Sequence, residues 1–475
     1  MKKFFQYHKM TLLMAVAVVL FYFSFAYDLD RADFIKLFGL YTGAFFLTWK
    51  IVKIEKSQFW LLATLALVFR LIFLFAIPNL SQDFYRFIWD GRMIAAGWNP
   101  YLYLPENLIA SGTAPIAQAP ELYKGMGALN ASHYTNYPPL NQIIFALAGI
   151  LSGKSILGAV VVLRSVIILA DLGTLYFGRK LLKKLKLPEY QIFWFILNPF
   201  IIIELTGNLH FEGVMIFLLI LSLYYLVIKK WILSAVFIAL SISLKLLPLI
   251  FLPLLFRFFS KKNNAYNLNF GKLILYYLIV GAVVILSFLP FLSSELISNF
   301  MDSIGLWFQK FEFNASIYYV VRWVGFQVKG YNIIATAGKV LPVLVILIIG
   351  ALALFRKNNS LKKLIVSMLL TVSVYFFLST TIHPWYVAMP LILSVFTRYK
   401  FALIWSFIVI LSYTAYIHEI YHENLWLVAL EYIVVIGMFM YEVFWLKLES
   451  PSRLFAFGDN DEVSDVNDSA KEMSR

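Results

Sequence analysis

Long apolar runs alternate with short polar segments over most of this chain. Runs of roughly 18–22 residues recur from about Met10 to Trp445, and each is long enough to cross a bilayer as an α-helix. The runs are continuous, whereas the strands of a membrane β-barrel would alternate apolar and polar residues. The pattern therefore predicts an all-α polytopic integral membrane protein with about 13 transmembrane helices.

The longest polar segment, about Ser81 to Pro138, follows the third apolar run, and loops of this length are usually functional. It begins SQDFYRFIWDGRMIAAGWNPYLY, and a helix here would place Asp83, Arg86 and Asp90 on one face. A carboxylate so close to the end of a span would reach both a lipid head group and a water-soluble substrate. An interfacial amphipathic helix with solvated charges is the other interpretation of the same spacing.

Composition agrees with a membrane protein, because 61% of the 475 residues are hydrophobic and only 14% are charged. Such a chain cannot supply the polar surface of a soluble protein. The net charge of +14 does not indicate nucleic-acid binding, since the basic residues cluster in short loops such as 50–56, 179–186 and 356–363. This positive-inside pattern places the Asp83 loop on the non-cytoplasmic face. Cysteine is absent, which excludes disulfides and thiolate metal sites.

Three parts of the chain differ in character. Residues 58–446 contain the long loop and most of the apolar runs, and residues 1–57 contain two further spans. Residues 447–475 are acidic and polar, which predicts a disordered cytoplasmic tail. The sequence shows neither a soluble domain nor a repeat of fixed period.

Polar residues are distributed unequally between the two predicted faces. The cytoplasmic face has basic anchors, whereas the outer face collects acids, histidines and arginines: Asp83, Asp90, Arg92, His133, His210, Glu212, Glu312, Arg322 and His383. This asymmetry predicts a site open to the outer face, although outer turns carry some polar residues in any membrane protein. Arg322 in particular lies among aromatic residues, where interfacial anchors are common.

Three charged residues lie inside apolar runs, where unpaired charges are costly. Arg164 and Asp171 are seven residues apart on one helix face, so we expect each to be compensated by the other or by a neighbour. Lys245 lies near the outer end of its run, and Pro248 interrupts the helix beside it. A freed backbone and an ammonium group at that boundary suit a phosphate.

Six segments together resemble one protein family: QDFYRFIWDGR, GWNPY, NYPPL, NLHFEGVMIF, SLKLLPLIFLP and IHPWY. In their order and predicted side they resemble the GT-C fold glycosyltransferases, of the bacterial polyprenyl-phosphate-mannose-dependent mannosyltransferase kind. The likeness runs from about residue 58 to 400. In these families the catalytic loop typically follows the first span, so we interpret residues 1–57 as an N-terminal addition to a GT-C-like catalytic domain with a large outer first loop.

The resemblance implies an enzyme that moves a sugar, with mannose expected, from a polyprenyl-phosphate donor to a hydroxyl of a lipid or glycan acceptor, with inversion. It implies an active site on the extracytoplasmic face of the inner membrane. Asp83 would be the catalytic base, because it lies nearer the end of the third span than Asp90 does. Lys245 and His383 would lie near the donor phosphate. The other outer-face candidates for substrate binding are Asp90, Arg92, His133, His210, Glu212 and Arg322.

The expected chemistry requires no cofactor. A divalent metal is compatible with it, but the sequence contains no ligand cluster that demands one. The alternative from another class is a polytopic lipid or glycan transporter or flippase. Such a protein would show repeat symmetry and polar residues near the middle of the bilayer.

Overall fold

The computed structural model describes residues 6–259, 270–418 and 421–445, in which helices account for the regular structure and no strand is formed. The predicted all-α class is confirmed. The predicted disordered tail, residues 447–475, lies outside the described residues.

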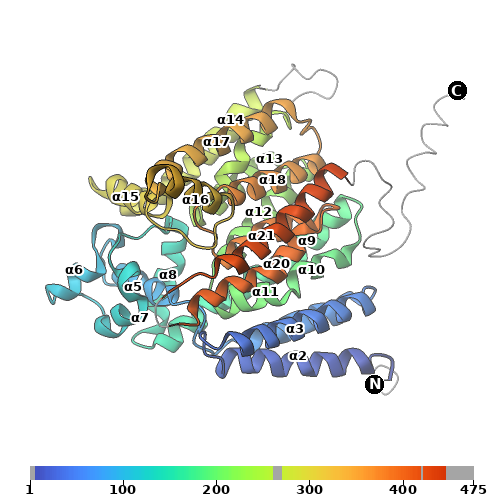
Figure 1. Ribbon diagram of the computed structural model, residues 1–475, viewed down its shortest axis with the longest axis horizontal. Coiled ribbons are helices and arrows are strands. Elements are labelled where there is room, and N and C mark those ends of the chain that lie inside the picture. The colour runs from blue at the N-terminus through green and yellow to red at the C-terminus, as the bar shows by residue number, and fades with distance from the viewer. Residues whose placement is uncertain (1–5, 260–269, 419–420, 446–475) are drawn as a thin grey trace, which may run out of the picture.

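The helices follow one another with mostly short connections, and Figure 1 colours them in chain order. Several are interrupted by 3-10 or π-helical turns, named here with η. Their bounds are α2 Lys9–Tyr27, α3 Phe34–Ile54, α4 Phe59–Leu71, α5 Asp83–Ala95, α6 Pro105–Ala110, α7 Ala119–Ala131, α8 Pro139–Ser152, α9 Ile156–Lys184, α10 Phe193–Ile196, α11 Pro199–Ile201, η3 Ile202–Gly207, α12 Glu212–Val227, α13 Trp231–Leu244, η4 Leu247–Phe256, α14 Phe270–Phe288, α15 Leu296–Gln309, α16 Ile317–Lys329, α17 Ile334–Phe355, α18 Leu361–Phe377, η6 Pro384–Val387, α19 Ala388–Val395, α20 Phe401–Ile408, η7 Val409–Tyr416, α21 Leu425–Met440 and η8 Tyr441–Trp445.

Within the described residues, six helices are long and apolar enough to cross a membrane: α2, α3, α9, α14 extended to Phe291, α17, and α21 extended to Trp445. A seventh candidate is the pair Glu189–Ile196 and Pro199–Gly207, which is bent by 49°. The protein is therefore a multi-pass membrane protein. Most of the other predicted crossings coincide with shorter apolar helices of 10–17 residues, because prolines and polar residues divide the apolar runs. The predicted number of about 13 crossings stays a prediction.

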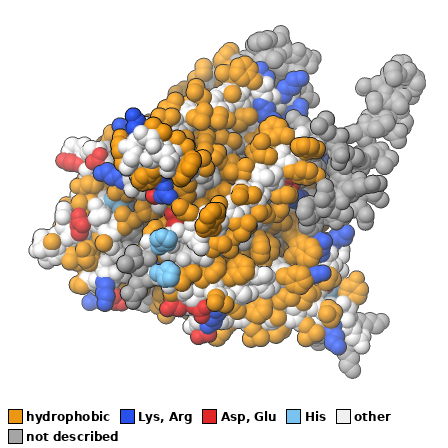
Figure 2. Space-filling model, viewed as in Figure 1, with side chains coloured by type: hydrophobic (Ala, Val, Ile, Leu, Met, Phe, Trp, Pro, Cys, Tyr) orange, Lys and Arg blue, Asp and Glu red, His pale blue; other side chains and the backbone are white. Residues whose placement is uncertain are grey.

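The long helices run side by side, with α5, α6, α7 and α8 gathered at one end of the molecule (Figure 1). The segment expected to be a long outer loop is therefore largely helical. The two N-terminal helices, α2 and α3, pack against each other as a hairpin along one flank. Figure 2 shows apolar side chains over most of the visible flank and charged side chains mainly toward the ends, as a protein embedded in a bilayer requires.

Helix α5 lies unusually close to α8 because two glycines face each other at the crossing. A Cβ atom added at Gly91 would lie 2.0 Å from the carbonyl oxygen of Phe145, and one added at Gly149 would lie 2.5 Å from that of Gly91. Beside this contact the Phe87 and Phe145 rings stack with centroids 4.7 Å apart. The packing fixes the position of α5, which begins at Asp83.

The two charged residues inside α9, Arg164 and Asp171, both find partners, as expected. Asp171 in α9 pairs with Arg70 in α4 at 2.7 Å, so its partner is a neighbour and not Arg164. Arg164 instead donates to four backbone carbonyls at 2.6–3.1 Å, those of Leu74, Ala76, Thr206 and Gly207. These carbonyls lie where the chain leaves helical structure, so the guanidinium group satisfies backbone acceptors that water cannot reach.

We expect Gly91→Ala to destabilise the protein by roughly 3 kcal/mol, because the added carbon would meet a backbone carbonyl that cannot rotate away. The matched control is Gly39→Ala in α3, where an added Cβ has no atom within 4 Å and alanine favours a helix. Thermal unfolding of both variants in the same detergent measures the difference. Equal unfolding temperatures would contradict the close α5–α8 contact.

Candidate active site

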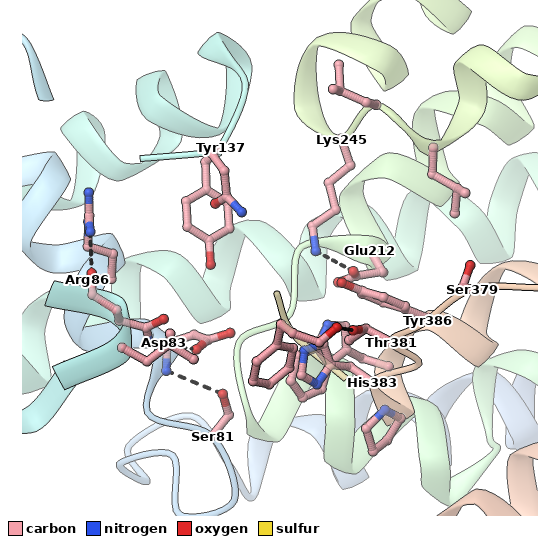
Figure 3. Close-up of a pocket in the computed structure, with 18 of the residues that line it drawn as sticks. Ser81, Asp83, Arg86, Tyr137, Glu212, Lys245, Ser379, Thr381, His383 and Tyr386 are labelled. Atoms are coloured by element: carbon pink, nitrogen blue, oxygen red, sulfur yellow. Dashed lines mark hydrogen bonds and ion pairs between the residues drawn. The ribbon is translucent and has the colours of Figure 1, made fainter. Parts of the chain in front are cut away.

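A cavity of about 710 Å³ lies where the start of α5, the start of α12, the end of α13 and the loop before η6 meet. Figure 3 shows Asp83 on one wall, with Lys245, Glu212 and His383 across the cavity from it. Segments distant in the sequence thus bring together five of the predicted site residues: Asp83, His133, Glu212, Lys245 and His383.

Asp83 is the first residue of α5 and is partly buried at the cavity wall. Its backbone N–H donates to the Ser81 hydroxyl at 3.3 Å, and its Oδ1 accepts a hydrogen bond from the Asn130 amide at 3.1 Å. Burial raises the pKa of the Asp83 carboxyl, while the Asn130 hydrogen bond and the cations of Lys245 and Arg31 oppose this shift. A carboxylate with a raised pKa is a better proton acceptor than a free aspartate. Its position and basicity suit a general base.

Lys245 is the residue at which α13 ends, and its backbone is extended, with φ −147° and ψ 137°. The helix cannot continue through Pro248 without losing backbone hydrogen bonds, and the carbonyl of Leu244 accepts from the Asn141 amide at 2.9 Å. The Lys245 ammonium donates to the Glu212 carboxylate, whose side chain is 2% exposed against 21% for Lys245. A lysine has three N–H donors, so Glu212 orients the ammonium and leaves donors for a ligand.

Two histidines contribute hydrogen-bonding groups to the cavity. Burial lowers the pKa of His383 to about 3, and the charge of Lys245 acts in the same direction. Burial also lowers the pKa of His133 to about 4, with a further contribution from Arg86. Both imidazoles are therefore neutral near pH 7. His383 can hydrogen-bond a phosphate, but the positive charge at the site comes from Lys245 and Arg31.

His210 lies behind the cavity wall. Its ring stacks on Trp385 with centroids 3.6 Å apart, and Trp385 stacks in turn on His383 at 4.6 Å. Trp385 and His383 line the cavity, whereas His210 does not. His210 thus supports the orientation of the loop that carries His383.

Asp90, Arg92 and Arg322 also do not line the cavity. Asp90 is buried and accepts hydrogen bonds from Arg86 at 2.8 Å and from Gln142 at 3.0 Å. Arg92 donates to the backbone carbonyl of Ala117 at 2.7 Å. These contacts hold α5 against its surroundings, and they occupy Asp90 about two helical turns along α5 from the carboxylate of Asp83.

Arg322 belongs to a separate cluster in the second polar region of the chain. Its guanidinium group pairs with Glu312 and lies 4.2 Å from the centroid of the Tyr319 ring. This arrangement matches the interfacial-anchor interpretation of Arg322 and places it outside the cavity.

The cavity lining also includes residues that were not predicted as site residues, among them Arg31, Asn130, Tyr137, Trp385 and Tyr386. Tyr137 lies in the NYPPL segment, and Trp385 and Tyr386 lie in IHPWY, so the motifs that carried the resemblance contained the signal for these three. Asn130 and Arg31 carried no such signal. Within the described part of the chain, no three His, Asp or Glu side chains are grouped to hold a metal ion.

Residues 14–260 match a family model described as alpha-(1->6)-mannopyranosyltransferase, N-terminal domain. Over 193 residues the chain is 27% identical to alpha-(1->6)-mannopyranosyltransferase A of Corynebacterium glutamicum. The aligned region covers 38% of this chain and 35% of that protein. The chain therefore spans about a third of the length of this curated relative. No solved structure matches the chain. The matched region contains Asp83, Glu212 and Lys245, and it begins within α2.

We expect Lys245→Met to destabilise the protein by roughly 3 kcal/mol, because it leaves the buried Glu212 carboxylate without its cation. The double variant Lys245→Met/Glu212→Gln should regain much of this loss. Thermal unfolding of the two single variants and the double variant measures the coupling between the two side chains. Additive effects of the single substitutions would show that the pair contributes nothing to stability.

Proposed function

Because this chain belongs to the alpha-(1->6)-mannopyranosyltransferase family, we propose that it transfers a mannosyl residue from a polyprenyl-phosphate donor to an acceptor hydroxyl, with inversion. Family membership confirms the resemblance found in the sequence. The observation that carries the proposal is the placement of Asp83 across one cavity from the Lys245–Glu212 pair. An inverting transfer needs a base on one side of the sugar and a cation at the leaving group on the other.

In the proposed reaction Asp83 takes the proton of the acceptor hydroxyl as its oxygen attacks the anomeric carbon. The bond between that carbon and the phosphate oxygen breaks, and the electron pair leaves with the polyprenyl phosphate. Lys245 stabilises the negative charge that develops there, and neutral His383 contributes a hydrogen bond. A phosphate is already a good leaving group, so the mechanism needs no separate general acid.

The wall of the cavity beside Lys245 supports a lipid-linked donor. Leu246, Leu249 and Ile250 line it, and they belong to the segment that follows the break in α13. Leu246 is 37% exposed and Leu249 is 50% exposed, so this wall continues onto the apolar surface of the molecule. A prenyl chain could lie along that surface in the bilayer while its phosphate reaches Lys245.

The distribution of charge supports a site on the extracytoplasmic face. The basic residues at the ends of α3 and α9 include Lys53, Lys183 and Lys184. The cavity lies instead near Arg31, in the loop that joins α2 to α3 at the opposite end of the hairpin. Because basic clusters mark the cytoplasmic side, this arrangement favours a lipid-linked donor over a nucleotide sugar.

We expect Asp83→Asn to lower kcat by roughly 100-fold or more, because the amide cannot accept the acceptor proton. The purified protein is incubated with polyprenyl-phosphate mannose and a glycan acceptor, and the product is measured by mass spectrometry. Donor binding and the unfolding temperature should stay close to those of the unmodified protein. A folded Asp83→Asn protein that turns over normally would exclude Asp83 as the base.

The matched control is Asp90→Asn, on the same helix. Asp90 holds Arg86 and does not reach the cavity, so its substitution should lower the unfolding temperature more than Asp83→Asn does. Its effect on kcat, measured on the folded fraction, should be smaller. Lipid movement across vesicles without any product in the same preparations would favour the flippase alternative.

The proposed orientation can be tested with single cysteines, because the chain contains none. Cysteine introduced at the exposed positions Thr113 or His422 should react with an impermeant reagent on intact cells. Cysteine at exposed Lys184, the last residue of α9, should react only after permeabilisation. The reverse labelling pattern would show that the cavity faces the cytoplasm.

A further inference from the structure

The N-terminal hairpin reaches the cavity through its connecting loop. Arg31 lies between α2 and α3 and lines the same cavity as Asp83. No sequence motif connects Arg31 with Asp83, and residues 1–57 were interpreted as an addition to the catalytic domain.

Arg31 contacts both the backbone that leads to Asp83 and an aromatic wall. Its Nη1 donates to the carbonyl oxygen of Leu80 at 3.2 Å, and its guanidinium carbon lies 4.0 Å from the centroid of the Tyr416 ring. Within the described part of the chain, no carboxylate forms an ion pair with Arg31, whereas Lys245 pairs with Glu212. Arg31 is thus a cation whose charge stays available to the cavity.

The same hairpin holds the segment between α4 and α5 at two further points. The Asn79 amide donates to the carbonyl oxygens of Phe25 at 2.7 Å and Leu29 at 2.9 Å. The Tyr27 hydroxyl donates to the carbonyl oxygen of Ile72 at 2.9 Å. Together with the Arg31 contact, these bonds tie the non-helical approach to Asp83 to the end of α2.

We propose that the α2–α3 hairpin is part of the active site and that Arg31 is the positioning residue of Asp83. Arg31 fixes the backbone three residues before the carboxylate and supplies a cation on that side of the cavity. This inference rests on the proposed role of Asp83 as the base. It makes residues 1–57 necessary for catalysis.

Electrostatics supports this role. The charged and titratable groups that interact electrostatically with Asp83 are Arg31, Lys245, Glu212, Tyr137, Tyr386 and Tyr416. The other titratable groups that line the cavity are His133 and His383, which are neutral near pH 7, and Tyr375, Tyr413 and Tyr421. Arg86 also lines the cavity, but its charge is paired with Asp90. Burial raises the pKa of Asp83, and Arg31 and Lys245 are the two cations that oppose this shift. Without Arg31 a smaller fraction of Asp83 is ionised at a given pH.

The test compares Arg31→Gln and Arg31→Lys in the full-length protein, with kcat/KM for mannosyl transfer measured from pH 5 to 9. Glutamine keeps a donor for the Leu80 carbonyl but removes the charge. We expect the acidic limb of its pH profile to move upward by roughly 0.5–1 pH unit, which lowers kcat/KM on that limb by roughly 3–10-fold and by less at higher pH. Lysine keeps the charge, so it should restore the position of the limb.

Two further variants separate charge from geometry. Asn79→Ala loosens the same segment without a change of charge, so it should lower kcat and leave the acidic limb in place. Lys36→Gln removes a charge from the same hairpin at its surface pair with Asp28 and should change neither quantity. Unfolding temperatures identify any variant that fails to fold. If Arg31→Gln does not fold, the pH profile of Arg31→Lys is the test, because its acidic limb should stay in place.

The outcomes distinguish this inference from the proposed function. A wild-type rate and pH profile for folded Arg31→Gln, in a preparation where the unmodified protein transfers mannose, would overturn the role of Arg31 alone. Equal limb shifts for Arg31→Gln and Lys36→Gln would also overturn it. An unmodified protein that transfers no mannose would overturn the proposed function and this inference together.

Discussion

The structure depends on the requirement that backbone carbonyls inside a membrane protein find hydrogen-bond donors where helices end. Arg164 meets this requirement at the point that matters for the site. Its buried guanidinium group binds carbonyls of the segment after α4 and of the π-helical turn η3. The first segment leads to Asp83 and the second leads to His210 and Glu212. The Arg164 side chain therefore joins the segment that precedes Asp83 to the segment that precedes Glu212, and these two residues lie on opposite walls of the cavity.

The same requirement explains how other irregular segments around the cavity are stabilised. Asn141 satisfies the carbonyl of Leu244 where α13 ends, so Lys245 can leave the helix and turn toward Glu212. Asn208 accepts from the backbone N–H of Leu80 at 3.2 Å, which joins the two segments that Arg164 holds. Helix breaks place functional side chains within reach of each other, and each break needs a polar partner elsewhere in the chain. Buried polar residues near the site are thus largely structural.

This division explains which features the sequence could predict. Apolar runs and basic loops determine which turns share a face, so Asp83, Lys245 and His383 could be expected on one side, and the structure places all three at one cavity. Side-chain partners depend on tertiary packing instead. Asp83 and Asp90 lie only seven residues apart, yet the carboxylate of Asp90 is occupied by hydrogen bonds from Arg86 and Gln142. Arg31 could not be predicted, because only folding brings the α2–α3 loop beside Tyr416.

The charges of the cavity suit the proposed reaction because they let charge move without changing its total. Apart from Arg86, whose charge is paired with Asp90, Arg31 and Lys245 carry two positive charges, and ionised Asp83 and Glu212 carry two negative charges. When Asp83 accepts the acceptor proton it becomes neutral, and the phosphodiester donor gains one negative charge as it leaves as a monoester. Negative charge therefore moves from the wall beside Arg31 to the wall beside Lys245. In a partly buried site a net change of charge is costly. Arg31 stabilises the negative charge of Asp83 before the reaction, and Lys245 stabilises the negative charge of the leaving phosphate.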